Sequence, residues 1–563
     1  MEFLKAKGRY IEEGNKQILL RGFGLGGWFL PEGYMWKLYQ KCDRPRRMEA
    51  MIERLCGRAY AEDFWQRYLD FYISKKDMEW IAKEGFNSVR LPLNARHLYD
   101  VKENVFSLNK NMIARMDELI SWCREYKLYV ILDMHGAPGG QTGQNIDDSE
   151  DDHPRLFTES RYERELVWLW MELVKHYQEE PVVAGYDLLN EPVPNFFCQY
   201  NDKVLPLYRK LIKEIRTIDR KHMIILEGLH WASDFSLFHE FTKEEAQDNI
   251  LLQFHKYWNN PDEESLEPFL NVSNVLNAPL FMGEGGENNC DWYTTAFPLY
   301  ERLNISWSFW SYKKMENKNS PVTFAVPEGW KELIDWMDGK GDLSRDRARE
   351  ILDQFLHNIR DSRHNPQVLH ALKRELPLRI PCEAYEDAQF ASTRIVGAAL
   401  RLRDPVSILF ENGKTGKVDY ERMGGEEQPP EENLLVMLLP GDGVKYLFYC
   451  RKEEIEVTIR AGGQGSLLLE LCDGEKTEVT VNQNQDYHVV ISCLPKEQEE
   501  CKQHQQYTVN QKCGEHQECK EDKEHQKQEE NNQYPEEKDN NPQKELWIRG
   551  LEGTVLLDYL YLS

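Results

Sequence analysis

The sequence predicts a (β/α)₈ TIM barrel followed by an all-β sandwich, and three observations support this prediction. The chain has 563 residues, 41% of them hydrophobic, so it is long enough for more than one domain. Eight short apolar segments alternate with amphipathic segments over about residues 15–315, a pattern typical of parallel strands that are buried on both faces. From about residue 381 the apolar segments become short and partly alternating, which is typical of antiparallel sandwiches.

The eight predicted barrel strands are short, nearly continuous apolar runs. They span residues 18–27, 87–93, 128–135, 183–191, 222–228, 249–255, 279–284 and 305–312. Amphipathic stripes between them predict the connecting helices, one of which follows a Ser160–Glu163 capping box. Residues 318–380 are expected to form the last helices, so we expect the barrel domain to span residues 1–380.

Residues 381–563 form the second predicted domain, a jelly-roll-like β-sandwich. A tract at 496–545 interrupts it, rich in Glu, Gln, Lys, Asn and His, with Val509 as its only aliphatic residue. Such a tract buries too little apolar surface to offset the entropy of ordering, so we expect a disordered insertion. Its Cys-x₂-His spacings could bind zinc, but nothing apolar surrounds them and we expect no metal there. They involve Cys501, His504, Cys513, His516 and Cys519.

Composition excludes several classes of partner. The formal net charge of −26 opposes binding to nucleic acid or to an anionic membrane surface. No apolar run is long enough to cross a bilayer, and the first residues lack the features of a secretory signal. The 12 cysteines are scattered, as reduced thiols are. We therefore expect a cytoplasmic protein, whose oligomeric state the sequence leaves open.

Polar side chains lie at the carboxyl ends of six predicted strands, where barrel enzymes carry their active sites. They are Arg90, His135, Asn190, Glu191, His255, Tyr257, Glu284 and Trp310. Each residue alone has an ordinary structural interpretation, such as a turn or a buried histidine. Their occurrence at one strand end after another instead predicts a catalytic site.

Two carboxylates on different strands meet the chemical requirement of glycoside hydrolysis. One carboxyl group must protonate the leaving oxygen, and the other must attack the anomeric carbon in its ionised form. Asn190 can bond the sugar 2-hydroxyl, and Trp310 can form a floor beneath the sugar. Arg90 and Tyr257 can orient Glu284, and the two histidines can hydrogen-bond substrate or carboxylates.

The motifs at these strand ends resemble those of glycoside hydrolase family 5, the cellulase-like barrel enzymes. They are VRLP, LDMHG, LLNEP, FHKYW, GEGG and SFWSYKK, and the resemblance covers about residues 15–330. It implies a retaining double displacement with Glu191 as acid/base and Glu284 as nucleophile. The other six residues match near-invariant positions of the family.

Two further segments are similar to the exo-acting β-1,3-glucanase branch of that family. They are GLGGWF (24–29) and HGAPGGQTGQNIDDS (135–149). The branch has an aromatic–Asp–Asn sequence where this chain has Asn145-Ile146-Asp147-Asp148. The polar loop 136–160 could wall off one end of the cleft and make it a pocket, or it could be an ordinary solvated loop.

The second domain resembles carbohydrate-binding modules of families 6 and 35 in its first and last segments, IPCEAYEDA (380–388) and VLLDYLYLS. This resemblance implies that Glu383 and Asp558 could help to bind a structural calcium. The alternative is a sandwich that only supports the barrel.

Together these features predict a retaining β-glycosidase, exo-acting on β-glucosides or short β-glucan oligosaccharides, that needs no metal or organic cofactor. An endo-β-1,4-glucanase with an open cleft is the first alternative. A carbohydrate-binding protein without turnover is the second, although the complete set of polar residues opposes it.

Overall fold

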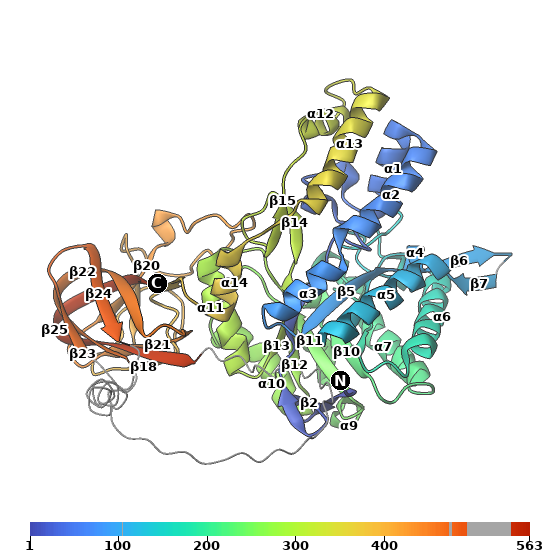
Figure 1. The fold of residues 1–563 in the computed structure, drawn as a ribbon. Helices are drawn as coiled ribbons and strands as arrows, with labels where there is room; N and C mark the ends of the chain where they lie inside the picture. Colours follow the sequence, from blue (N-terminus) through green and yellow to red (C-terminus); the bar gives the residue numbers. More distant parts are fainter. Residues whose placement is uncertain (104, 472–475, 493–541) are drawn as a thin grey trace, which may run out of the picture. The chain divides into compact units, whose positions relative to one another are not determined.

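The computed structural model describes residues 1–563 except 104, 472–475 and 493–541 (Figure 1). The described residues form two compact units. One contains Met1–Leu372 with Val418–Pro429, and the other contains Lys373–Lys417 with Pro430–Ser563.

Two boundaries expected from the sequence, the start of the second domain at residue 381 and the end of the insertion at residue 545, lie in strands of the second unit. Residue 381, the expected domain start, is at the end of β17 (Leu378–Pro381), which pairs with β25 (Gln543–Leu562). The expected insertion at 496–545, with its cysteines and histidines, lies outside the described residues as far as residue 541. Its last three residues belong to β25 and are therefore strand.

Eight parallel strands close into a barrel in the first unit, as the sequence predicts. They are β4 (Arg21–Gly24), β5 (Ser88–Asn94), β8 (Tyr129–Gly136), β9 (Val183–Asp187), β10 (Met223–Glu227), β11 (Ile250–His255), β12 (Leu280–Gly286) and β13 (Ser306–Trp310). The last strand, β13, pairs with the first, β4, and completes the ring. Almost every strand residue is buried, because the filled interior covers one side and helices cover the other.

Helices on the outside of the barrel connect the strands. They include α3 (Lys75–Lys83), α5 (Lys110–Tyr126), α6 (Ser160–Tyr177), α7 (Asn201–Ile215), α10 (Glu267–Leu276) and α11 (Cys290–Arg302). Their buried residues recur at helical spacing, as Leu166, Leu169 and Leu173 do in α6. The predicted Ser160–Glu163 capping box is wrong, because Glu159 is the N-cap of α6 and Ser160 already lies in its first turn.

Three helices fall in the range 318–380 that was expected to end the barrel domain: α12 (Trp330–Met337), α13 (Arg345–Arg360) and α14 (Pro366–Lys373). Figure 1 shows α13 beside α1 (Pro45–Cys56) and α2 (Arg58–Tyr72), which come from the first connection of the barrel. Aromatic rings fill this contact. The Phe355 ring centroid lies 4.3 Å from that of Trp36 and 5.3 Å from that of Trp330.

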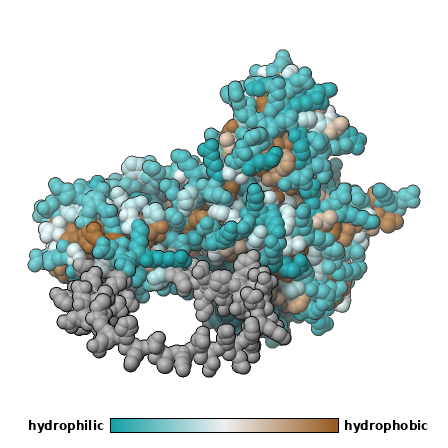
Figure 2. All heavy atoms as spheres, in the orientation of Figure 1, coloured by the Kyte–Doolittle hydropathy of each residue, from teal (hydrophilic) through white to brown (hydrophobic). Residues whose placement is uncertain are grey.

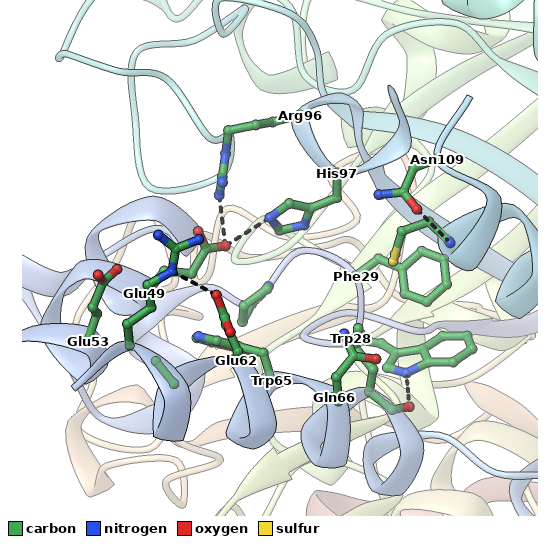
Figure 3. Close-up of a pocket in the computed structure, with 15 residues that line it drawn as sticks. Trp28, Phe29, Glu49, Glu53, Glu62, Trp65, Gln66, Arg96, His97 and Asn109 are labelled. Carbon is green, nitrogen blue, oxygen red and sulfur yellow. Dashed lines mark hydrogen bonds and ion pairs between the residues drawn. The ribbon is translucent and has the colours of Figure 1, made fainter. Parts of the chain in front are cut away.

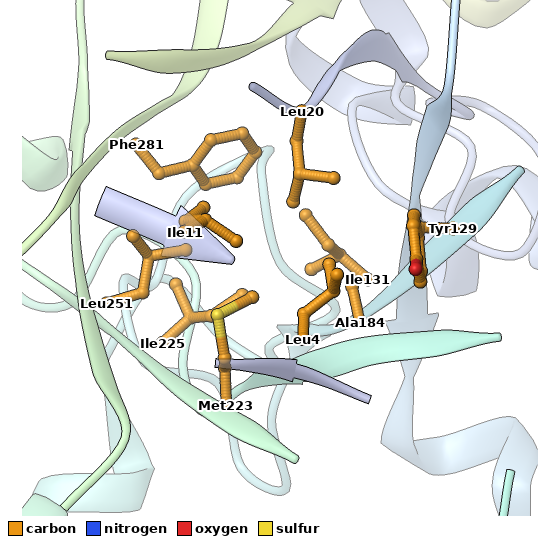
Figure 4. Packing of buried hydrophobic residues seen from close by; sticks show 10 residues of the cluster. All are labelled: Leu4, Ile11, Leu20, Tyr129, Ile131, Ala184, Met223, Ile225, Leu251 and Phe281. Carbon is orange, nitrogen blue, oxygen red and sulfur yellow. The ribbon is translucent and has the colours of Figure 1, made fainter. Parts of the chain in front are cut away.

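The first residues of the chain cover the amino-terminal end of the barrel. They form an antiparallel sheet of β1 (Leu4–Lys7), β2 (Tyr10–Glu13) and β3 (Lys16–Ile18). Leu4 and Ile11 point from this sheet into a buried cluster (Figure 4). The cluster also contains Leu20, Tyr129, Ile131, Ala184, Met223, Ile225, Leu251 and Phe281. These residues lie near the starts of the barrel strands, so the carboxyl ends stay free for a functional site.

In the second unit, nine described strands form one connected antiparallel sheet. They are β17, β18 (Asp387–Gln389), β19 (Ser407–Phe410), β20 (Leu434–Leu438), β21 (Gly443–Tyr449), β22 (Glu454–Leu471), β23 (Lys476–Val481), β24 (Gln485–Ser492) and β25. The antiparallel all-β prediction is confirmed. Calcium binding by Glu383 and Asp558 stays a prediction.

Two strands of this sheet are longer than the sequence pattern indicated. β22 and β25 each run through a stretch that reads as two short strands separated by glycines. The glycines are needed where the two strands pair closely. A Cβ atom on Gly553 would lie 2.0 Å from the carbonyl oxygen of Gln464, so only glycine fits there.

The surface agrees with the acidic composition. The face in Figure 2 is mostly hydrophilic, and exposed apolar side chains include Val101 and Val105 on the hairpin of β6 (Tyr99–Lys102) and β7 (Val105–Leu108). No helix in the described part of the chain is long and apolar enough to span a membrane. The seven cysteines of the described residues are all free thiols.

The sheet over the barrel end provides a stability test with a matched control. Ile11→Ala should lower the free energy of unfolding of the barrel unit by about 2–4 kcal/mol, because it empties a buried site. Tyr10→Ala, at a neighbouring residue of β2 that is 37% exposed, should change it by less than about 0.5 kcal/mol. Urea denaturation followed by fluorescence measures both. Equal effects of the two substitutions would show that the sheet does not seal the barrel.

Candidate active site

The structure brings all eight predicted site residues together at the carboxyl ends of the strands. Direct contacts link them into one group. Arg90 contacts Asn190 and Glu284, Tyr257 contacts Glu284, His255 contacts Glu191 and Glu284, and His135 contacts Glu284 and Trp310. Seven of the eight side chains are buried, with Tyr257 partly exposed.

The two glutamates predicted to be catalytic lie close to each other. One carboxylate oxygen of Glu191, one of Glu284 and a ring nitrogen of His255 all lie within 4.8 Å of one another. Glu191 follows β9, and Glu284 is in β12. These strands are not neighbours in the barrel, so the side chains reach toward each other across its carboxyl end.

Glu284 is held by two donors from different strands. Arg90 Nη1 donates to Oε1 at 2.5 Å, and the Tyr257 hydroxyl donates to Oε2 at 2.9 Å. Each oxygen thus has its own donor, which fixes the plane of the carboxylate.

Glu191 has a different environment. Its Oε1 lies 2.7 Å from His255 Nδ1, and its backbone N–H donates to Glu227 Oε2 at 2.7 Å. The pKa of the Glu191 carboxyl is raised to about 7, mainly by burial; the charges of Glu284 and Glu227 also raise it, and His255 lowers it. Its backbone has a φ of 44°, an uncommon left-handed conformation for a residue other than glycine.

Three buried carboxyl groups beneath the two glutamates were not predicted from the sequence: Asp133, Asp187 and Glu227. Arg90 contacts all of them, at 3.2 Å, 2.8 Å and 2.9 Å. Each is an acidic residue inside an apolar strand segment. An acidic residue in such a run is almost never buried without a partner, so its position could have indicated a buried polar group.

These three carboxyl groups differ in how readily they ionise. Burial raises the pKa of Asp133 and of Asp187 well above the ordinary value. Burial also acts on Glu227, but the nearby His255 and Arg90 outweigh it and lower the pKa. The three groups are close enough to hold a metal ion, yet Arg90 forms an ion pair with each of them, donates hydrogen bonds to Asp187 and Glu227, and supplies the positive charge.

The surroundings of the two histidines shift their pKa values in opposite directions. Burial lowers the pKa of His135 to about 4, so its ring is neutral at pH 7. Burial alone would also lower the pKa of His255, but the charges of Glu227 and Glu284 raise it well above its ordinary value. The surrounding carboxylates thus favour the protonated form of His255, which can donate to Glu191.

Trp310 forms one wall of the site, and its ring packs closely against two glycines, Gly24 and Gly26. Its ring stacks on His135 with centroids 5.2 Å apart and planes at 7°. A Cβ atom on Gly24 would lie 2.5 Å from the ring, and one on Gly26 would lie 2.8 Å from it. Gly24 at the end of β4 and Gly26 just after it thus leave space for the indole.

A second polar group beyond Trp310 was also missed. The Tyr34 hydroxyl accepts a hydrogen bond from Trp310 Nε1 at 3.0 Å and donates to Glu287 Oε1 at 2.7 Å. Lys314 forms an ion pair with Glu287. Burial and the charges of Glu284 and Glu287 raise the pKa of Glu32, which is 2% exposed. Lys314 ends the SFWSYKK motif and Glu287 directly follows GEGG, but the sequence does not indicate that both meet Tyr34, because only closure of the barrel brings them together.

The loop 136–160 is packed against the site and is not an ordinary solvated loop. Asp147 is buried and accepts hydrogen bonds from the backbone of Thr142, Gly143 and Ser149. Gln141 Nε2 donates to the carbonyl oxygen of Asn190 at 2.9 Å. The loop is therefore tied to the strand end that carries Glu191.

A separate cavity of about 540 Å³ lies between α1, α2 and the segment after β4 (Figure 3). Trp28, Phe29 and Trp65 contribute aromatic side chains, and Glu49 accepts hydrogen bonds from Arg96 and His97. None of the eight predicted residues is among those that line it. It is therefore distinct from the candidate active site.

Comparison with known proteins agrees with this geometry. Residues 57–316 match the cellulase family, glycosyl hydrolase family 5. A beta-xylosidase from Phanerodontia chrysosporium is 30% identical over 258 residues, which cover 46% of this chain and 52% of that protein. The chain thus matches about half the length of this relative.

Other relatives have different names. Endoglucanase C from Acetivibrio thermocellus is 24% identical over 45% of this chain and 88% of that protein. A glucan 1,3-beta-glucosidase from Kluyveromyces lactis is 26% identical over 44% of this chain and 59% of that protein. Among solved structures, rutinosidase from Aspergillus niger has 18% identity and a TM-score of 0.44, with 53% of this chain and 91% of that chain covered.

The pKa of Glu191 can be tested without any substrate. Glu284→Gln removes a neighbouring negative charge at constant shape, so the pKa of Glu191 should fall below its value of about 7. Carbon-13 NMR titration of the labelled carboxyl group measures the shift. Asp353→Asn, at an exposed site, is the control. An unchanged or higher pKa in Glu284→Gln would contradict the electrostatic coupling.

Proposed function

We propose that the barrel unit, whose residues 57–316 match the cellulase family, glycosyl hydrolase family 5, hydrolyses β-glycosidic bonds with net retention, from the end of its substrate. The separation of the two glutamates carries the proposal. Retaining enzymes hold the two carboxyl groups about 5–5.5 Å apart, and inverting enzymes need about 6.5–9.5 Å to fit a water molecule. Glu191 and Glu284 bring oxygens within 4.8 Å, which favours retention.

The reaction begins with attack by the Glu284 carboxylate on the anomeric carbon. The bond to the leaving oxygen breaks, and Glu191 donates its proton to that oxygen. Arg90 and Tyr257 orient the attacking carboxylate. A carboxyl group with a pKa of about 7 suits this donation, because it is partly protonated near neutral pH and still a useful acid.

A water molecule completes the reaction. Glu191, now ionised, removes a proton from the water as it attacks the anomeric carbon and releases Glu284. Two attacks on opposite faces restore the starting configuration. His255 contacts both carboxylates and can stabilise the charge that moves between them.

Asn190 is placed to recognise the sugar. Its Oδ1 accepts a hydrogen bond from Arg90 at 2.8 Å. Its Nδ2 is buried and has no partner among the described residues, so it can donate to a substrate hydroxyl. A buried donor without a partner is costly unless a ligand satisfies it.

Burial of the site supports action at a chain end. The two glutamates are 6% and 4% exposed, Asn190 is fully buried, and the group of Tyr34, Glu287 and Lys314 stands beyond Trp310. An enclosed site accepts a terminal sugar more readily than the middle of a polymer. An endo-acting glucanase is the second candidate, favoured by the match to endoglucanase C over most of its length.

A substrate screen tests the proposal and the choice of sugar. Aryl β-glucosides and β-xylosides, compared because relatives carry both names, should be hydrolysed, and proton NMR should show the β-anomer as the first product. A dyed internal-chain polysaccharide should release little dye. First release of the α-anomer would exclude retention, and rapid release of dye would favour the endo-acting candidate.

The pH dependence of kcat/KM should report the proton on Glu191. With that pKa at about 7 in the folded enzyme, kcat/KM should fall as the pH rises through about 7, because the acid loses its proton. In Glu191→Ala, an aryl glycoside with a very acidic phenol needs no protonation, so this fall should disappear. Persistence of the same fall in the variant would assign it to another group.

Chemical rescue should separate the two glutamates. In Glu191→Ala, azide needs no general base and should attack the glycosyl-enzyme, giving a β-glycosyl azide. In Glu284→Ala, azide should displace the leaving group directly from the opposite face and give the α-azide. NMR of the products distinguishes the two. Exchange of the two products between the variants would reverse the assigned roles.

A further inference from the structure

An aromatic cluster includes two residues of the loop that follows Glu191. Phe196, in η4 (Asn195–Tyr200), is 53% exposed. Its ring centroid lies 5.1 Å from that of Phe197 and 5.7 Å from that of Trp231. Phe197 in turn lies 5.9 Å from His153. Three loops of the catalytic face thus contribute rings to one partly exposed surface.

The backbone beneath Trp231 is held in an unfavourable conformation. His230, Trp231 and Ala232 in α8 (Leu229–Ala232) have φ values of 52°, 58° and 56°. None is glycine, and side chains disfavour this left-handed region. Such conformations persist only where surrounding contacts enforce them, and they concentrate at functional sites.

The enforcing contacts come from the Glu191 loop. The backbone N–H of His230 donates to the carbonyl oxygen of Val193 at 3.1 Å, and Val193 itself has a φ of 53°. His230 Nε2 lies 3.0 Å from Asn201 Nδ2. The loop after β10 is thereby fixed to the loop after β9, with the Trp231 ring beside that of Phe196.

The location of this surface follows from the proposed chemistry. Glu191 donates its proton to the leaving oxygen, so the leaving group lies on the Glu191 side of the sugar. Phe196 is five residues after Glu191 in the same loop. Trp310 and Tyr34 enclose the other side of the site. The cluster thus shares its loop with the proton donor, and the leaving group departs on the side of that residue.

The chemistry of the surface favours a planar apolar group. Ring faces dominate it, and both nitrogens of His230 already have partners, Asn201 and Asp234. The His230 ring is therefore not free to bond the hydroxyls of a second sugar. We propose that Phe196 and Trp231, supported by Phe197, form an aglycone subsite that binds planar apolar leaving groups, so that aryl β-glycosides are the preferred substrates.

The test compares two substrates that differ only in the leaving group. It uses the full chain and two substrates with the same sugar. One is an aryl glycoside with 4-methylumbelliferone as leaving group, and the other is the glycosyl fluoride, whose leaving group has no aromatic ring to bind. Phe196→Ala should lower kcat/KM for the aryl glycoside about fivefold to tenfold and leave the fluoride within about twofold. Tyr10→Ala, which removes an exposed ring at the opposite end of the barrel, should change neither.

The outcomes separate this inference from the proposed function on which it rests. Equal losses on both substrates, or no loss on either, would overturn the subsite while leaving the glycosidase intact. A parent enzyme that hydrolyses neither substrate would contradict the proposed function. In that case saturation-transfer NMR with free 4-methylumbelliferone decides on the subsite: binding that Phe196→Ala abolishes supports it, and equal binding by both proteins overturns it.

Discussion

A single buried guanidinium, that of Arg90, connects the carboxyl groups at the centre of the barrel. It contacts Glu284, Asp133, Asp187 and Glu227, and it is fully buried itself. Several carboxylates cannot be removed from water together unless a cation compensates them. Arg90 lowers the pKa values of Asp133, Asp187 and Glu227 against the effect of burial, and it holds the Glu284 carboxylate in place.

The two glutamates show how environment gives different roles to the same side chain. Glu284 faces a guanidinium and a phenol that both donate to it, whereas Glu191 lies against His255 on a backbone of left-handed conformation. Neither difference belongs to the residue type. Each arises from the strand ends that surround it, which is why a barrel with many separate loops can support such specialised chemistry.

Much of this could be predicted from the sequence because parallel strands buried on both faces leave a strong signal. Apolar runs indicated all eight strands, and the polar residues at or just beyond their carboxyl ends indicated the site. The acidic layer of Asp133, Asp187 and Glu227 was missed because its residues lie inside those runs and resemble interruptions. Glu287 and Lys314 lie beside or within the motifs GEGG and SFWSYKK, but they were missed as a group with Tyr34 because the three meet only when the barrel closes. In the second unit, glycines that normally mark turns instead allow the long strands β22 and β25 to pair closely. The sequence pattern therefore suggested two short strands in place of each of them.

The pairing of the last barrel strand with the first also constrains the order in which the chain can fold. β4 ends at Gly24, and its partner β13 begins only at Ser306, so the ring cannot close until more than half of the chain has been synthesised. The sheet of β1, β2 and β3 emerges first, yet the apolar cluster that it covers includes Phe281 from β12. Leu4 and Ile11 are therefore synthesised well before part of the apolar surface that they cover. Contacts of such long sequence separation form slowly and leave apolar surface open to association with other chains. The sheet of β1, β2 and β3 is thus the segment of the barrel unit that stays longest without its full set of partners.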